Sequence, residues 1–179
     1  MKHDQLRCAA RASRSGWLAG LLAALVALLA ACASPASIAP GTPAAQVLQT
    51  LGAPTGRYPA PEGGERLQYS MQPAGQQVFN VDTDAQGRVL RTEQALSEAL
   101  FGQRILPNAW TRADVLREYG RPARTMGVHS FDGDIWVWRY LDGPTWRLLF
   151  IDIDRTGVVR GWSNGDEDLP DPPDPPDVR

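Results

Sequence analysis

Two stretches of the chain carry the same local patterns in the same order, and this duplication limits the possible folds more than any other feature. The first stretch contains Val47-Leu48-x-x-x-Gly52-x-Pro54 and then Val81-Asp82-x-Asp84-x-x-Gly87-x-Val89. The second contains Val115-Leu116-x-x-x-Gly120-x-Pro122 and then Ile151-Asp152-x-Asp154-x-x-Gly157-x-Val159. The first motif is typical of a short apolar helix ending at a glycine, and the second of a strand, a turn and a strand. Their recurrence in order predicts two copies of one structural unit.

Each copy is predicted to hold a helix followed by three antiparallel strands. The strands are expected at 66–70, 77–82 and 88–93 in the first copy, and at 135–141, 145–152 and 158–163 in the second. Thr42 and Thr111 are candidate N-caps of the two helices. The predicted fold class is therefore α+β, with two tandem repeats of a helix plus an antiparallel three-stranded sheet.

The repeats are expected to cover residues 41–93 and 108–163, joined by a linker over 94–107. Apolar residues at helical spacing predict a short linking helix over 93–101, closed by Gly102. Residues 164–179 are acidic and rich in proline, and are predicted to form an extended, disordered tail.

A lipobox, Leu29-Ala30-Ala31-Cys32, precedes the repeats. It follows a basic segment and then the uncharged apolar run 17–31, which is shorter than the roughly 20 residues of a membrane span but suits a signal peptide. We expect residues 1–31 to be a signal peptide, Cys32 to be acylated, and 32–40 to be a flexible tether. The alternatives are an ordinary signal peptide in which Cys32 is incidental, or an uncleaved anchor.

The cysteine inventory agrees with this interpretation. The chain has two cysteines, Cys8 and Cys32. Removal of the signal peptide would leave only Cys32, so the mature protein could form no intrachain disulfide. Among bacterial lipoproteins an aspartate after the cysteine retains the protein at the inner membrane. Ala33 therefore favours the periplasmic face of the outer membrane.

The charge balance gives no support for a nucleic-acid partner. Between Cys32 and Gly165 the chain holds 13 arginines and 13 acidic residues, because four of the 18 basic residues lie in the signal peptide and Arg179 lies in the tail. A neutral body lacks the basic patch that phosphate binding requires. We expect no nucleic-acid partner.

The lipobox, the helix-stop motif from Gly41 to Pro54, the Tyr69 strand and the Val-x-Asp-x-x-Gly hairpin together resemble the BamE (SmpA/OmlA) lipoprotein domain. The tandem pair also resembles the β-lactamase inhibitor protein fold. The resemblance covers about residues 40–163. It implies an accessory or scaffold role in outer-membrane protein assembly or envelope maintenance, with the β-barrel assembly machinery as the implied protein partner. The alternative is a lipid-anchored inhibitor or ligand-binding module. BamE has one such unit whereas this chain has two, so no partner-contacting residues are transferred.

The sequence contains little that predicts catalysis or cofactor binding. Asp82, Asp84 and Glu93 fit part of a calcium-loop spacing, but strands rather than helices flank them, so a polar hairpin turn is the preferred interpretation and no metal is expected. His129 is the one histidine outside the signal peptide. It has no nearby cysteine or second histidine to form a zinc site. We expect no enzyme activity, no cofactor and no small-molecule substrate.

The second copy is predicted to be apolar on both faces of its sheet. Trp138 and Tyr140 occupy the positions in the second copy that Leu67 and Tyr69 occupy in the first, and we assign them to the face that the helix covers. Strand alternation then places a second set on the opposite face. This candidate partner-binding surface consists of Ile135, Val137, Arg139, Trp146, Leu148 and Phe150. Its apolar and aromatic character suits a protein interface, and equally suits a face covered by the other repeat, the linking helix or the tail.

Overall fold

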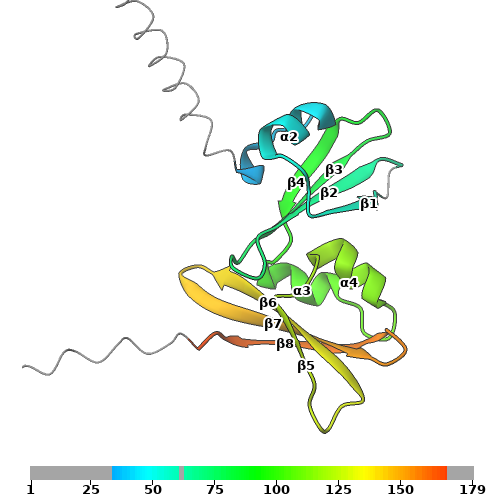
Figure 1. Cartoon of the computed structure of the whole chain (residues 1–179), viewed down its shortest axis with the longest axis vertical. Helices are drawn as coiled ribbons and strands as arrows, with labels where there is room; N and C mark the ends of the chain where they lie inside the picture. Colours follow the sequence, from blue (N-terminus) through cyan, green and yellow to red (C-terminus); the bar gives the residue numbers. More distant parts are fainter. Residues whose placement is uncertain (1–33, 61–62, 169–179) are drawn as a thin grey trace, which may run out of the picture. The chain divides into compact units, whose positions relative to one another are not determined.

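A computed structural model describes residues 34–60 and 63–168. The described chain is α+β, with three α-helices and two separate four-stranded antiparallel sheets (Figure 1). The elements, labelled as in Figure 1, are the 3-10 turn η2 (Pro35–Ser37), α2 (Ala44–Leu51), β1 (Gly56–Pro59), β2 (Glu65–Ser70), β3 (Val78–Thr83), β4 (Val89–Gln94), α3 (Glu98–Arg104), α4 (Arg112–Tyr119), β5 (Arg124–Met126), β6 (Gly133–Asp142), β7 (Thr145–Asp154) and β8 (Val159–Asp166).

Both sheets follow the chain in simple order, β1-β2-β3-β4 and β5-β6-β7-β8. The sequence predicts three strands in each sheet, and the structure adds a short edge strand to both, β1 and β5. Neither carries a period-two apolar sequence pattern: β1 reads Gly-Arg-Tyr-Pro, and β5 reads Arg-Thr-Met with all three residues exposed. The prediction of three-stranded sheets was therefore wrong by one strand in each.

The helix that precedes each sheet ends in the same way. Gly52 and Gly120 adopt positive φ angles of 78° and 69°, and their N–H groups bond to Leu48 and Leu116. Such angles cost glycine little, which explains why the helix-stop motif recurs. Thr111 caps α4 through a capping box with Asp114, as the sequence predicts. The N-cap of α2 is Pro43 rather than the predicted Thr42.

Each sheet has one face covered by helices, and the side chains between that face and its helices form a hydrophobic cluster. α2 covers the first sheet, where Val47 meets Leu67, Phe79 and Val81. α3 and α4 cover the second sheet, in a larger cluster that includes the fully buried Trp138, Tyr140, Leu149 and Ile151 (Figure 1). The predicted inward orientation of these four side chains is confirmed.

The linking helix begins later than predicted. β4 continues to Gln94 because that residue pairs with Phe79, and α3 starts only at Glu98. Gly102 lies inside α3 instead of closing it. Ala95 and Leu96 are buried in the second cluster, so part of the predicted linker belongs to the core.

The segments at the two ends of the body are also more ordered than the sequence suggests. Pro35 is buried, Ile38 packs on the first cluster, and the Ile38 carbonyl accepts a bond from Thr92. The tether predicted over 32–40 therefore does not extend beyond Ser34. Likewise β8 runs to Asp166, so the predicted tail boundary at 164 was too early. Cys32, the signal peptide and residues 169–179 lie outside the described residues.

Candidate functional site

The polar outer face of the first sheet holds helix α4. Gln68 and Asn80, directly paired across β2 and β3, are 1% and 2% exposed. The Gln68 side-chain amide donates to the Leu116 and Arg117 carbonyls, and that of Asn80 donates to the Glu118 carbonyl at 2.9 Å. These amides bind carbonyls in the last turn of α4, where the helix itself leaves acceptors without N–H partners. The Leu116 carbonyl also accepts the Gly120 N–H.

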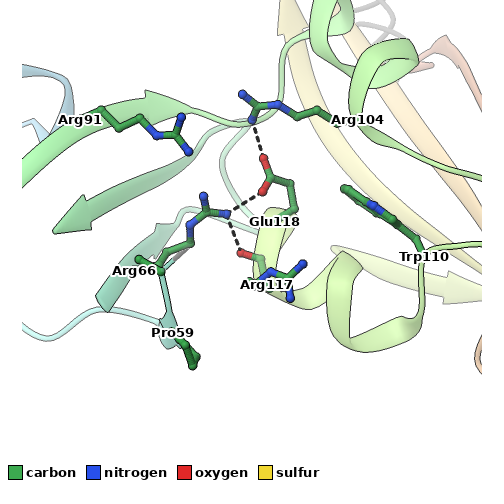
Figure 2. A pocket seen from close by; sticks show the side chains of 8 residues that line it. Pro59, Arg66, Arg91, Arg104, Trp110, Arg117 and Glu118 are labelled. Atoms are coloured by element: carbon green, nitrogen blue, oxygen red, sulfur yellow. Dashed lines mark hydrogen bonds and ion pairs between the residues drawn. The ribbon is translucent and has the colours of Figure 1, made fainter. Parts of the chain in front are cut away.

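A buried ion network extends this contact (Figure 2). The Arg66 guanidinium donates to both carboxylate oxygens of Asp82, at 2.7 and 2.9 Å, and to Glu118 at 2.6 Å. It also donates to the Arg117 carbonyl. Glu118 accepts a further bond from Arg104 of α3. Glu118 therefore joins β2 of the first sheet to the two helices that cover the second sheet.

The network lies at a cavity of about 600 Å³. Figure 2 shows four arginines around it, Arg66, Arg91, Arg104 and Arg117, together with Glu118 and Trp110. Each arginine is paired with a carboxylate, and these are Asp82, Glu118, Glu93 and Asp114. Because the charges balance, we interpret this cavity as a structural junction and not as an anion site.

Electrostatics support that interpretation. Burial raises the pKa of Asp82, but the hydrogen bonds and charges of Arg66 and Arg91 outweigh it and hold the pKa below the usual value. A carboxylate held ionised in this way acts as a fixed counter-charge. It is poorly suited to exchanging protons near neutral pH.

The predicted partner-binding residues do lie on one face of the second sheet, but to different depths. Val137 is fully buried and Leu148 is 7% exposed. Ile135, Arg139 and Phe150 are half-buried, and Trp146 is 37% exposed. The Arg139 guanidinium stacks on the Trp146 ring at 5.1 Å. The residues available to a partner are therefore Ile135, Trp146 and Phe150, with Arg139 beside them.

A loop of the first unit lies against part of this face. The Gln72 side chain donates to the Arg139 carbonyl at 2.7 Å and accepts from the Arg139 N–H at 3.3 Å. This pair of bonds resembles that of a neighbouring strand at the edge of β6. The Arg139 guanidinium donates in turn to the carbonyls of Pro73 and Ala74 and to Glu167. The loop between β2 and β3 thus docks at the β6 edge.

Strand β8 leaves the same face thinly covered. Gly165 lies opposite Leu148, and Gly161 lies opposite Asp152. A Cβ atom at Gly165 would come within 3.6 Å of the Phe150 ring. Burial raises the pKa of Asp152 above its usual value. The glycines make a shallow floor beside Phe150, which extends the exposed surface toward β8.

The weak calcium-loop candidate is not assembled. Asp82 is bound by arginines, and Glu93 pairs with Arg104. Asp84 accepts the turn N–H groups of Gln86 and Arg88, as expected for the preferred hairpin interpretation. Among the described residues, no group of three histidine, cysteine or acidic side chains could hold a metal ion. His129 is exposed in the loop between β5 and β6.

Sequence reasoning missed the junction at Arg66, Gln68, Asn80, Asp82 and Glu118. With Leu67 and Tyr69 inward, strand alternation puts Gln68 on the outward face of the first sheet, and the matching position of the next strand holds Asn80. Nothing in this pattern predicts a helix on that face. A usable signal was present, because the outward positions of β2 and β3 hold an arginine, two amides and an aspartate together. Polar side chains of this kind can hydrogen-bond to the backbone carbonyls at the buried end of a helix just as they can hydrogen-bond to water.

Comparison with known proteins gives little guidance. No protein family and no curated protein matches the chain. A crystal structure of a DUF4309 family protein (YjgB) from Bacillus subtilis subsp. subtilis str. 168 is similar to it, with 14% identity over 70% of this chain and 79% of that chain and a TM-score of 0.27. A likeness at this level supports no argument about function. No helix within residues 34–60 and 63–168 is long and apolar enough to cross a membrane.

Proposed function

We propose that this protein is a lipoprotein of the outer membrane, anchored through Cys32 and facing the periplasm, that works by binding another protein. The observation that carries the proposal is the lipobox Leu29–Cys32 at the end of a basic and then apolar segment. The position of the body supports it, since buried packing begins at Pro35, directly after the predicted lipid site.

The proposed binding role rests on the residues of the outer face of the second sheet. Trp146 and Phe150 lie there beside Arg139, and tryptophan, tyrosine and arginine dominate the energetics of protein interfaces. The neighbouring strand contributes Gly161 and Gly165, which place no side chain over this face. We infer that Ile135, Trp146 and Phe150 form the contact and that no reaction takes place.

We further propose that the two units are copies of one BamE-like repeat. The helix stops at Gly52 and Gly120 support the duplication. The isolated bridges Pro43↔Arg88 and Thr111↔Val158 also support it, because they tie each helix start to its own hairpin. On this basis the partner is sought among the β-barrel assembly subunits. The second candidate function is that of an inhibitor or ligand-binding module. It is suggested by the presence of two such units in one chain, as in the β-lactamase inhibitor protein fold.

Replacing Cys32 with alanine is expected to move the protein from the membrane fraction to the soluble periplasmic fraction or to halt its processing. The reason is that two or more acyl chains supply stable membrane affinity. Metabolic labelling with palmitate and fractionation of the two membranes measure the effect. A Cys8→Ala variant is the control and should behave as the wild type. Equal labelling of the Cys32 variant would contradict the anchor.

Replacing Trp146 with glutamate is expected to reduce recovery of the partner by at least about tenfold, which corresponds to 1.4 kcal/mol. The change removes an aromatic ring of the kind that dominates interface energetics, and it puts in its place a carboxylate that must be desolvated on binding even where it pairs with Arg139. The measurement is quantitative affinity purification from solubilised outer membranes. Leu90→Glu is the matched control, because Leu90 is a similarly exposed apolar residue, 38% exposed, on the first sheet. Recovery with barrel-assembly subunits supports the accessory role, and absence of those subunits favours the inhibitor or ligand-binding module.

A further inference from the structure

Two cavities lie on either side of the chain segment between α4 and β5. The larger, of about 750 Å³, is lined by Arg121 and Pro122 together with Tyr58, Gln72 and Pro73. The smaller, of about 280 Å³, is lined by Ala123 and Arg124 together with Pro73, Val137, Leu148 and Glu167. The two cavities share Pro73, and between them their linings include each of residues 121–124, so we treat them as two parts of one groove along this segment.

This groove contains two cations that lack a counter-charge. Within the described ranges, Arg121 and Arg124 form no ion pair, and both are exposed. They contrast with the four arginines of Figure 2, all of which are paired with carboxylates. The groove, with its unmatched positive charge, is therefore a better candidate for an acidic ligand than the arginine-rich junction is.

The C-terminal segment of the same chain starts at this groove. The Glu167 N–H bonds to the Trp146 carbonyl, and the Glu167 side chain lines the smaller cavity with Arg124. Asp168 is the last described residue, and eleven residues follow it. At about 3.1 Å per residue in an extended proline-rich conformation, that length reaches well past Arg121.

The charges of the segment match those of the groove in spacing. Asp171, Asp174 and Asp177 recur at every third residue, with prolines between them. A polyproline II segment has three residues per turn, so these carboxylates would lie along one edge about 9 Å apart. Arg121 and Arg124 are also three residues apart, and extended chain at this spacing covers at most about 10 Å.

We propose that residues 169–179 bind in cis along this groove. Leu169 would cover Val137 and Leu148 at the smaller cavity, and Asp171 and Asp174 would pair with Arg124 and then Arg121. This inference does not depend on the lipid anchor or on an external partner.

The test uses the chain from Ala33 onward, which holds every described element and both hydrophobic clusters but neither cysteine. A nitroxide label attached at Val178→Cys is then the only modified site. We expect the label to broaden the amide resonances of Gly120 and Arg121, because Val178 lies only four residues beyond Asp174 in the proposed register. The broadening should be lost in the D171N/D174N/D177N variant and in the R121Q/R124Q variant. It should also weaken at 1 M salt, where the Debye length falls to about 3 Å.

Arg88→Gln is the matched control, because Arg88 forms no ion pair among the described residues either but lies in the β3–β4 turn of the first sheet. It should leave the broadening unchanged. Absence of broadening, or broadening that persists without the charges, would overturn the proposal. A mixture of nitroxide-labelled protein without ¹⁵N and ¹⁵N protein without nitroxide tests whether the segment of one molecule instead binds the groove of a second copy. Broadening that appears only between molecules would assign the groove to a second copy and overturn docking in cis.

Discussion

Replacing Arg66 with methionine is expected to lower the free energy of unfolding by about 3 kcal/mol, with a fall in Tm on the order of 10 °C. The Arg66 side chain is 6% exposed and is bound to Asp82 and Glu118, which are themselves nearly buried. Removing it leaves two buried carboxylates with fewer donors. We expect the lower end of the usual range because Arg91 still pairs with Asp82 and Arg104 with Glu118.

Chemical denaturation of both proteins at pH 7 measures this difference. The control is Arg57→Met on the adjacent strand β1, whose ion pair with Glu65 is 47% and 42% exposed. Exposed pairs contribute at most about 1 kcal/mol, so this variant should be close to the wild type. Equal losses in the two variants would show that the junction does not hold α4 to the first sheet.

Replacing Phe101 with alanine is expected to cost about 3–5 kcal/mol of unfolding free energy. Phe101 of α3 is fully buried and meets Tyr119, Tyr140 and Trp162 edge to face, with ring centroids 5.2–6.0 Å apart. Its loss would leave a cavity at the centre of the second cluster. Denaturant unfolding with tryptophan fluorescence measures the effect, since Trp162 lies next to the site.

The control for Phe101 is Leu106→Ala. Leu106 follows α3 and is 51% exposed, so its removal should change stability by no more than about 0.5 kcal/mol. If Phe101→Ala behaved like this control, α3 would be a connector between the units and not part of the second core. The segment predicted as a linker would then be dispensable for packing.

The sequence was sufficient to predict those elements whose conformation is determined by residues close together in the chain. The helix stops at Gly52 and Gly120 require a positive φ angle, and the turns at Asp84 and Asp154 depend on side-chain bonds to nearby N–H groups. These determinants lie within a few residues of each other. The inward side of β6 and β7 follows in the same way from alternation.

The sequence did not reveal the features that depend on contacts distant in the chain. Strand β1, Gly-Arg-Tyr-Pro, has no run of alternating apolar residues. Strand β5 exists because it pairs with Ile135, Trp136 and Val137. The burial of Gln68 depends on α4, some fifty residues further on. For Val137 and Leu148 the sequence left an exposed interface and a covered face equally open, because strand alternation cannot show that the Pro73 loop lies nearby.

The early start of packing at Pro35 has a mechanical consequence. If Cys32 carries the lipid as proposed, Ala33 and Ser34 alone separate the acylated residue from Pro35, which is buried. Three steps between neighbouring Cα atoms cover at most about 11 Å. The segment between the lipid and the folded body would then be short, and it would allow the body to rotate but not to move far from the anchor. Pro35 would then stay close to the lipid headgroups, which limits how far the start of the body can move from the membrane.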